Sequence, residues 1–111
     1  MPTFTHEQTG NAYQVATWEG LTGTEDGAAL SRSKMSDKTV QISGTLDGGT
    51  VVLEGSMDGD TWHTLTSDGI SEINALGLHW VWENPRYIRP SITGGGASSD
   101  VDVILCMSSL V

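Results

Sequence analysis

The sequence predicts an all-β protein, an antiparallel β-sandwich of the jelly-roll type with about seven to eight short strands. Three observations carry this prediction. Short runs alternate between apolar and polar residues, which is the period of a strand with one buried face. Asp-Gly and other turn signals separate these runs every ~8–12 residues. The chain has 14 glycines but only 3 prolines, and Leu, Lys and Arg are scarce, so tight turns are favoured over long helices.

Length and charge limit the protein further. A chain of 111 residues suits one domain with a single core. Its net charge of −9, from 14 acidic and 5 basic residues, repels phosphate, so we expect neither nucleic acid nor membrane as a partner. We see no signal peptide and no apolar run of the ~20 residues that a bilayer requires. A single cysteine, Cys106, is typical of a protein made in a reducing cytoplasm.

The N-terminal third divides into an arm, a strand and a loop. Residues 1–12 are polar apart from Phe4, and we interpret them either as a frayed end or as an arm that orders on a neighbour. Residues 13–111 then form the sandwich domain, which begins with a strand over 13–21. Residues 22–37 lack any period and hold Arg32 and Lys34, so we predict a long contact loop.

The central stretch, residues 38–65, predicts a β-meander. Val40 and Ile42 alternate with polar residues before Asp47-Gly48-Gly49 reverses the chain. The return run holds Val51 and Leu53, and Asp58-Gly59 reverses the chain again before residues 61–65. Alternation interrupted by Asp-Gly is a strong hairpin signal.

Three further strands complete the predicted sandwich. The first lies within residues 70–83, where four large apolar residues alternate: Leu76, Leu78, Trp80 and Trp82. The second spans residues 86–93, and Pro90 places it at an edge or a bulge. The third spans residues 100–107 and turns Val101, Val103, Leu105 and Met107 to one face, with Cys106 opposite.

The candidate sites give no catalytic or metal signature. Asp47, Asp58 and Asp60 lie in glycine turns, which we interpret as turn chemistry because no EF-hand spacing accompanies them. The histidines His6, His63 and His79 have no Cys or His at ligand spacing, and there is no G-x-S-x-G elbow. We therefore expect no enzyme activity, cofactor or metal.

The tryptophans and arginines point to contacts instead. Large rings on strands usually fill the core or a subunit contact, although Trp62 or Trp80 as a sugar platform is the alternative. Trp18, on the first strand, is a possible anchor at a partner. Of Arg86 and Arg89, we expect one to pair with a carboxylate inside the domain and the other to pair across an interface.

Motifs in this sequence resemble those of two protein families. GSMDGDTWHTL (55–65) with NPRYIRPSI (84–92) resembles discoidin-like jelly rolls, in framework strands alone. The stretch 38–107 is similar to small tailed-phage structural proteins. The matching motifs are Val40-Gln41-Ile42-Ser43-Gly44-Thr45, Gly55-Ser56-Met57-Asp58-Gly59-Asp60-Thr61-Trp62 and Glu83-Asn84-Pro85-Arg86-Tyr87-Ile88-Arg89-Pro90.

The phage resemblance implies a capsid decoration (cement) protein. Such a protein bridges major capsid protein subunits on the head exterior, often as a homotrimer, after synthesis in the host cytoplasm. The alternatives are a carbohydrate-binding module and a tail or head–tail connector subunit. The residues expected at a capsid or subunit interface are Phe4, His6, Trp18, Arg32, Lys34, Trp80 and Arg89.

Overall fold

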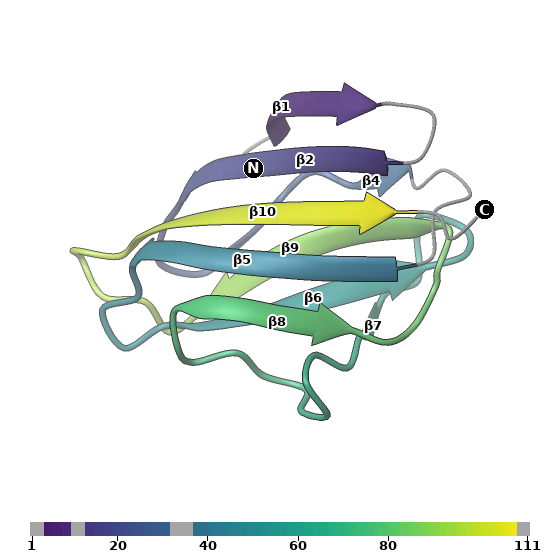
Figure 1. The fold of residues 1–111 in the computed structure, drawn as a ribbon. Coiled ribbons are helices and arrows are strands. Elements are labelled where there is room, and N and C mark those ends of the chain that lie inside the picture. The colour runs from purple at the N-terminus through teal and green to yellow at the C-terminus, as the bar shows by residue number, and fades with distance from the viewer. Residues whose placement is uncertain (1–3, 10–12, 32–36, 109–111) are drawn as a thin grey trace.

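The described residues form a two-layered β-sandwich (Figure 1). The computed structural model describes the backbone of residues 4–9, 13–31 and 37–108, and the side chains of residues 14–31 and 37–108. These residues are all-β, with strands in two antiparallel sheets and no helix, so the predicted fold class is confirmed. No helix that could span a membrane occurs among them.

Each sheet draws its strands from distant parts of the chain. The first sheet has the order β1 (Phe4–Thr9), β2 (Tyr13–Leu21), β10 (Asp100–Ser108), β5 (Asp37–Thr45) and β8 (Gly77–Val81). The second sheet has the order β3 (Glu25–Asp26), β9 (Tyr87–Thr93), β6 (Thr50–Ser56) and β7 (His63–Thr64), and β4 (Leu30–Ser31) also pairs with β9. Strands number more than we predicted because three of them are only two residues long.

The core lies between the sheets, and period-two alternation fills it. In β10 the predicted inward set, Val101, Val103, Leu105 and Met107, is fully buried, while Cys106 is exposed as expected. The other sheet contributes Val51, Leu53, Ile88 and Ile92. Burying each such side chain contributes about 1.5–3 kcal/mol, so this interior is the main source of stability.

Of the two strand pairs in the predicted meander, one forms and the other does not. Strands β6 and β7 pair as expected, with Glu54 opposite Thr64. Strands β5 and β6 do not pair, because the turn at Asp47 carries the chain from one sheet to the other. The turn itself forms, with the Gly49 amide donating to the Leu46 carbonyl at 2.8 Å. However, β10 and β8 occupy both edges of β5, so a turn signal fixes a reversal of the chain but not the strands that pair.

Pro90 lies in an interior strand, not at the predicted edge. Strand β9 has β6 on one side, and on the other it has β3 and β4, which stop short of each other opposite Pro90. Proline has no amide hydrogen to donate, so regular strand pairing is interrupted opposite Pro90. The Pro90 carbonyl still accepts a hydrogen bond from the Gly27 amide, at 2.8 Å. A Cβ on Gly27 would meet Pro90 and Trp18 at 2.8 Å, so glycine is required.

The N-terminal predictions change in part. Residues 4–9 of the expected arm form strand β1, which pairs antiparallel with β2 at the edge of the first sheet. The strand predicted over 13–21 is confirmed as β2. The expected loop 22–37 contains β3 and β4, so it is not without structure, and residues 32–36 of it lie outside the described residues.

Candidate docking surface

A row of exposed apolar side chains lies along β8. We call Leu76, Leu78, Trp80 and Trp82 the β8 ladder. Alternation turns Val81 into the core, where it is 1% exposed, and so turns the ladder to the outer face of the first sheet. The sequence pattern did not indicate that this larger apolar set faces outward.

The ladder leaves a substantial area uncovered. Leu78 is 67% exposed and Trp80 is 57% exposed, while Leu76 and Trp82 are each 52% exposed. The rings of Trp80 and Trp82 lie 5.9 Å apart between centroids, with a tilt of 55°. Since large aromatic side chains each bury 150–250 Å² when covered, the half-exposed ladder leaves on the order of 400 Å² uncovered. Patches of that size often mark interaction sites.

Residues 66–75, which we call the strap, close the backbone edge beside the ladder through residues 66–68 and pair with β6 of the second sheet through Ile73. The strap follows the free edge of β8, as Figure 1 shows below that strand. The Asp68 amide donates to the Trp80 carbonyl at 2.8 Å, and the Trp80 amide donates to Asp68 Oδ1 at 2.7 Å. The Trp82 amide donates to the Thr66 carbonyl at 3.1 Å. A partner therefore meets the side chains of the ladder, because these backbone groups are already paired.

Acidic groups lie on the strap side of the ladder and just beyond Trp82. Asp68 and Glu72 on the strap and Glu83 after Trp82 are exposed. The hydrogen bond from the Trp80 amide, with a smaller effect of His79, lowers the pKa of Asp68 against the opposing effect of burial. Burial alone raises the pKa of Glu83, but hydrogen bonds from the Thr66 hydroxyl and amide outweigh it, and the pKa is lowered. Both groups therefore keep their negative charge at neutral pH.

The rest of the outer face of the first sheet is uncharged across its centre. Strand register places Thr39, Cys106 and Val15 in a row beside Trp80. Gln41, Ile104 and Thr17 form the next row, beside Leu78. The acidic side chains of these strands lie toward their ends. On a chain with a net charge of −9, this face is one where another protein surface can approach without strong repulsion.

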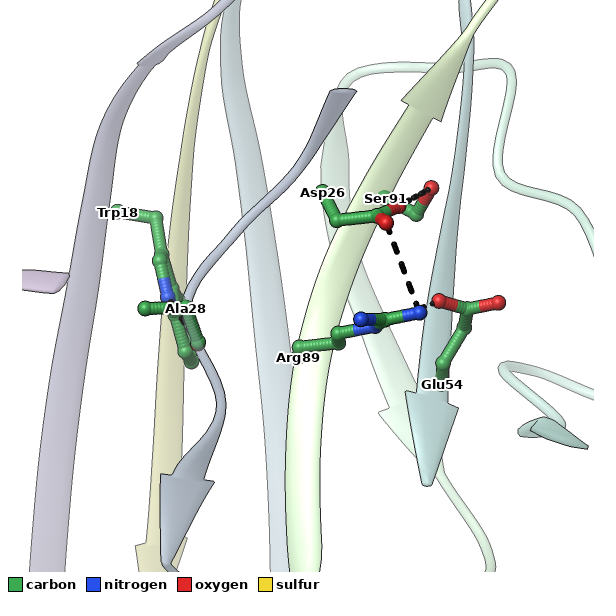
Figure 2. Close-up of polar contacts among 6 residues, drawn as sticks. All are labelled: Trp18, Asp26, Ala28, Glu54, Arg89 and Ser91. Carbon is green, nitrogen blue, oxygen red and sulfur yellow. Dashed lines mark hydrogen bonds and ion pairs between the residues drawn. The ribbon is translucent and has the colours of Figure 1, made fainter. Parts of the chain in front are cut away.

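The outer face of the second sheet holds a closed polar network instead (Figure 2). Arg89 Nε donates to Glu54 Oε1 at 2.9 Å, and a terminal nitrogen of Arg89 lies 3.5 Å from Asp26 Oδ2. The Ser91 hydroxyl donates to Asp26 Oδ1 at 2.7 Å. The guanidinium also lies over the ring of Trp62, at 4.2 Å from its centroid. Arg89 is thus the arginine that pairs within the domain.

The remaining predicted interface residues have different positions. Trp18 belongs to the core rather than to a contact: it is fully buried, and its indole Nε1 donates to the Ala28 carbonyl at 3.0 Å (Figure 2). Phe4 and His6 lie on β1, but their side chains are outside the described set, as are Arg32 and Lys34 altogether. Trp80 is the predicted residue that the described structure exposes on a surface.

Sequence reasoning missed three members of the ladder as site residues. Leu76, Leu78 and Trp82 share the alternation of Trp80, and that shared period was the available signal. When a strand has apolar residues on both faces, one face can be an interaction surface, but the sequence does not indicate which face it is.

The turn at Asp58 follows the predicted turn chemistry. Its Oδ1 accepts hydrogen bonds from the Asp60 and Thr61 amides, both at 2.9 Å, and from the Ser56 hydroxyl at 2.8 Å. These hydrogen bonds, led by the one from Thr61, lower the pKa of Asp58 to about 2. The carboxylate is engaged in holding its own turn.

Comparison with known proteins gives a fold relationship. No protein-family model matches the chain, and no curated protein sequence matches it. Among solved structures, the crystal structure of the SPBc2 prophage-derived protein YomS is similar, with a TM-score of 0.69 and 12% sequence identity. The similarity covers 92% of this chain and 99% of YomS. The chain therefore shares the fold of YomS over nearly its whole length.

Proposed function

We propose that this protein is a structural subunit of a phage particle, a decoration (cement) protein that bridges and stabilises major capsid protein subunits on the head exterior. The observation that carries the proposal is the β8 ladder, an apolar surface on an acidic sandwich. The motifs in residues 38–107 support the phage assignment, and the fold shared with a prophage-derived protein agrees with it.

The ladder has the energetics of a docking site. Covering on the order of 400 Å² of apolar surface at about 25 cal/mol per Å² contributes about 10 kcal/mol before the costs of association. Exposed tryptophans are among the residues that most often dominate binding energy. Trp80 and Trp82 are therefore the expected centre of the contact.

The surrounding charge defines the coat surface that fits. Asp68, Glu72 and Glu83 favour an apolar patch bordered by Lys or Arg, because complementary charge raises the rate of encounter and excludes wrong partners. Strand β1 lies at the opposite edge of the same sheet, so the expected contact of the N-terminal arm is compatible with docking through this face. Assembly as a homotrimer on the shell is the arrangement that the resemblance implies.

The test is co-sedimentation of the purified protein with empty, expanded shells of its phage. We expect saturable binding at many copies per shell and a higher melting temperature of the shell. Trp80→Glu, which places a charge in the ladder, is expected to reduce binding at least about a hundredfold. Met57→Glu is the matched control, since Met57 is 71% exposed but lies outside the ladder. Absence of wild-type binding, or equal binding by both variants, contradicts the proposal.

A carbohydrate-binding module is the second candidate, favoured by the exposure of Trp80 and Trp82. Their 55° tilt does not form one flat platform, and the Trp62 ring is covered on one face by Arg89. Glycan-array binding that is lost in a folded Trp80→Ala variant would favour this candidate. A tail or connector subunit would use the same ladder, and a low copy number per particle would distinguish it.

A further inference from the structure

His79 joins the two ends of the strap to β8. Its Nδ1 lies 2.9 Å from Asp68 Oδ2, and its Nε2 lies 3.2 Å from the Ala75 carbonyl oxygen. The His79 side chain is 13% exposed, whereas that of Asp68 is 45% exposed. One ring therefore contacts both the start and the end of the segment that closes the edge of β8.

Both partners of the ring are acceptors. A carboxylate and a backbone carbonyl offer lone pairs and no hydrogen, whereas a neutral imidazole carries one N–H and one lone pair. A neutral ring can therefore satisfy only one of the two contacts. At the other contact, the lone pair of a ring nitrogen faces the lone pairs of the acceptor oxygen. The arrangement is complete only when both ring nitrogens carry hydrogen.

We propose that the strap is a proton-dependent clasp, which the doubly protonated His79 ring fastens to β8 and which loosens when that ring loses a proton. A neutral ring that keeps its hydrogen on Nε2 turns a lone pair toward Asp68, whose carboxylate accepts from the Trp80 amide and whose amide donates to the Trp80 carbonyl, and so weakens the hold of Asp68 on this edge. These two Trp80 groups are the ones that a strand of another protein needs in order to extend the first sheet. This inference concerns the isolated chain and does not depend on the proposed function.

The charges around His79 support this assignment. The charged side chain that contacts the ring is Asp68, and β5 presents the uncharged Val40 opposite His79. Lys38 lies opposite Val81, one residue pair further along, where its amine donates to Asn84 and where Glu83 also lies. Asp68 is thus the described group that favours a positive charge on the ring.

The direction of the pH effect follows from both partners. Asp68 has a lowered pKa, so its half of the pair is lost only in acid. The His79 half requires hydrogen on both ring nitrogens, and raising the pH favours removal of one of them. The clasp is therefore tightest in mildly acidic solution and looser at pH 8.

Two NMR measurements on the purified chain test the clasp. The ¹⁵N shifts of the His79 ring report whether both nitrogens are protonated at pH 5. Exchange of the Trp80 amide, divided by that of the Leu105 amide in the core, removes the intrinsic effect of pH on exchange. We expect this ratio to rise about tenfold between pH 5 and pH 8, because a hydrogen bond to a charged group is lost.

Variants assign the effect to one histidine. His79→Gln removes the titrating group and is expected to abolish the pH dependence of the ratio, while His63→Gln, on the exposed strand β7, retains it. A ring that is neutral at pH 5, or a pH dependence that survives in His79→Gln, overturns the proposal. If His79→Gln does not fold, the wild-type ring shifts and the His63→Gln control decide the matter.

Discussion

The outer faces of the two sheets use the same kinds of residue in opposite ways. On the second sheet, Trp62 lies beneath the guanidinium of Arg89, which is itself held by Glu54 and Asp26. On the first sheet, Trp80 and Trp82 stand beside each other, both more than half exposed. The polar groups of the second face are paired with one another, whereas the first face presents apolar surface that the described residues leave uncovered.

This difference explains why counting aromatic residues does not locate a binding site. What matters for each tryptophan is which groups cover its ring. Trp18 is buried in the core, and Trp62 is stacked against Arg89, which is itself paired. Only for the remaining pair does the described structure leave large apolar area exposed. Substitutions at covered and at uncovered groups should therefore have different effects.

The largest expected effect compares a buried tryptophan with an exposed one. Trp18→Ala removes a fully buried ring and its hydrogen bond to Ala28, so it should lower the free energy of unfolding by about 3–5 kcal/mol. Trp80→Ala should change it by less than about 1 kcal/mol, because its ring is mostly in solvent. Urea denaturation of both variants measures this, and similar losses would contradict the assignment of the ladder as surface.

The next effect concerns the closed network. Arg89→Ala leaves Glu54 and Asp26 without their cation and uncovers Trp62, so we expect a loss of about 1–3 kcal/mol in unfolding free energy. Shell binding should be unchanged, because this face is not the docking surface. Arg86→Ala, whose guanidinium lies 5.4 Å from the Tyr87 centroid on an exposed residue, is the matched control with a loss below about 1 kcal/mol. Weaker docking of Arg89→Ala at unchanged fold would place the contact on the wrong sheet.

A smaller effect tests the acidic rim of the ladder. Glu72→Gln removes one exposed charge from the strap, and we expect a several-fold weaker association with shells at low salt and little change at high salt. Asp60→Asn, in the turn between β6 and β7, is the control that removes an equal charge elsewhere. Association rates over a salt series measure the difference, and equal slopes for both variants would exclude a role for the rim.

The smallest effect is a pH dependence of stability that comes from Asp58, in the turn between β6 and β7. The pKa of Asp58 is lowered from 3.8 to about 2, so its contribution to stability is fully present above pH 3.8 and disappears as pH falls to about 2. Asp58→Asn should therefore be less stable than wild type at pH 5, and the difference should close near pH 2. Denaturation midpoints over this range measure it, and a gap that stays constant would mean that the carboxylate does not hold the turn through its charge.

Much of the fold was predictable because it depends on local periodicity. The inward set of β10 and the position of β2 follow from alternation alone. The pairing of strands was not predictable, since β5 joins β10 across more than fifty residues of sequence and leaves its neighbour β6 to the other sheet. A turn motif carries no information about such distant partners.

The candidate site was predictable only in part, for the same reason. Trp80 was identified, but whether the ladder points inward or outward depends on the register of β8 on β5, where Gln41 lies opposite Leu78. A shift of one residue would bury the ladder and expose Val81. The Arg89 network joins residues of β3, β6 and β9, and nothing in the local sequence of any one strand indicates it.

Hydroxyl-radical footprinting shows whether the ladder is covered when the protein is in its particle. The protein is oxidised free in solution and bound in its particle, and modification of Trp80 and Trp82 is compared with that of Met57, which is exposed outside the ladder. We expect strong protection of both tryptophans in the particle and unchanged oxidation of Met57. Equal oxidation of Trp80 and Trp82 in the two states would show that the ladder remains uncovered and is not the docking surface.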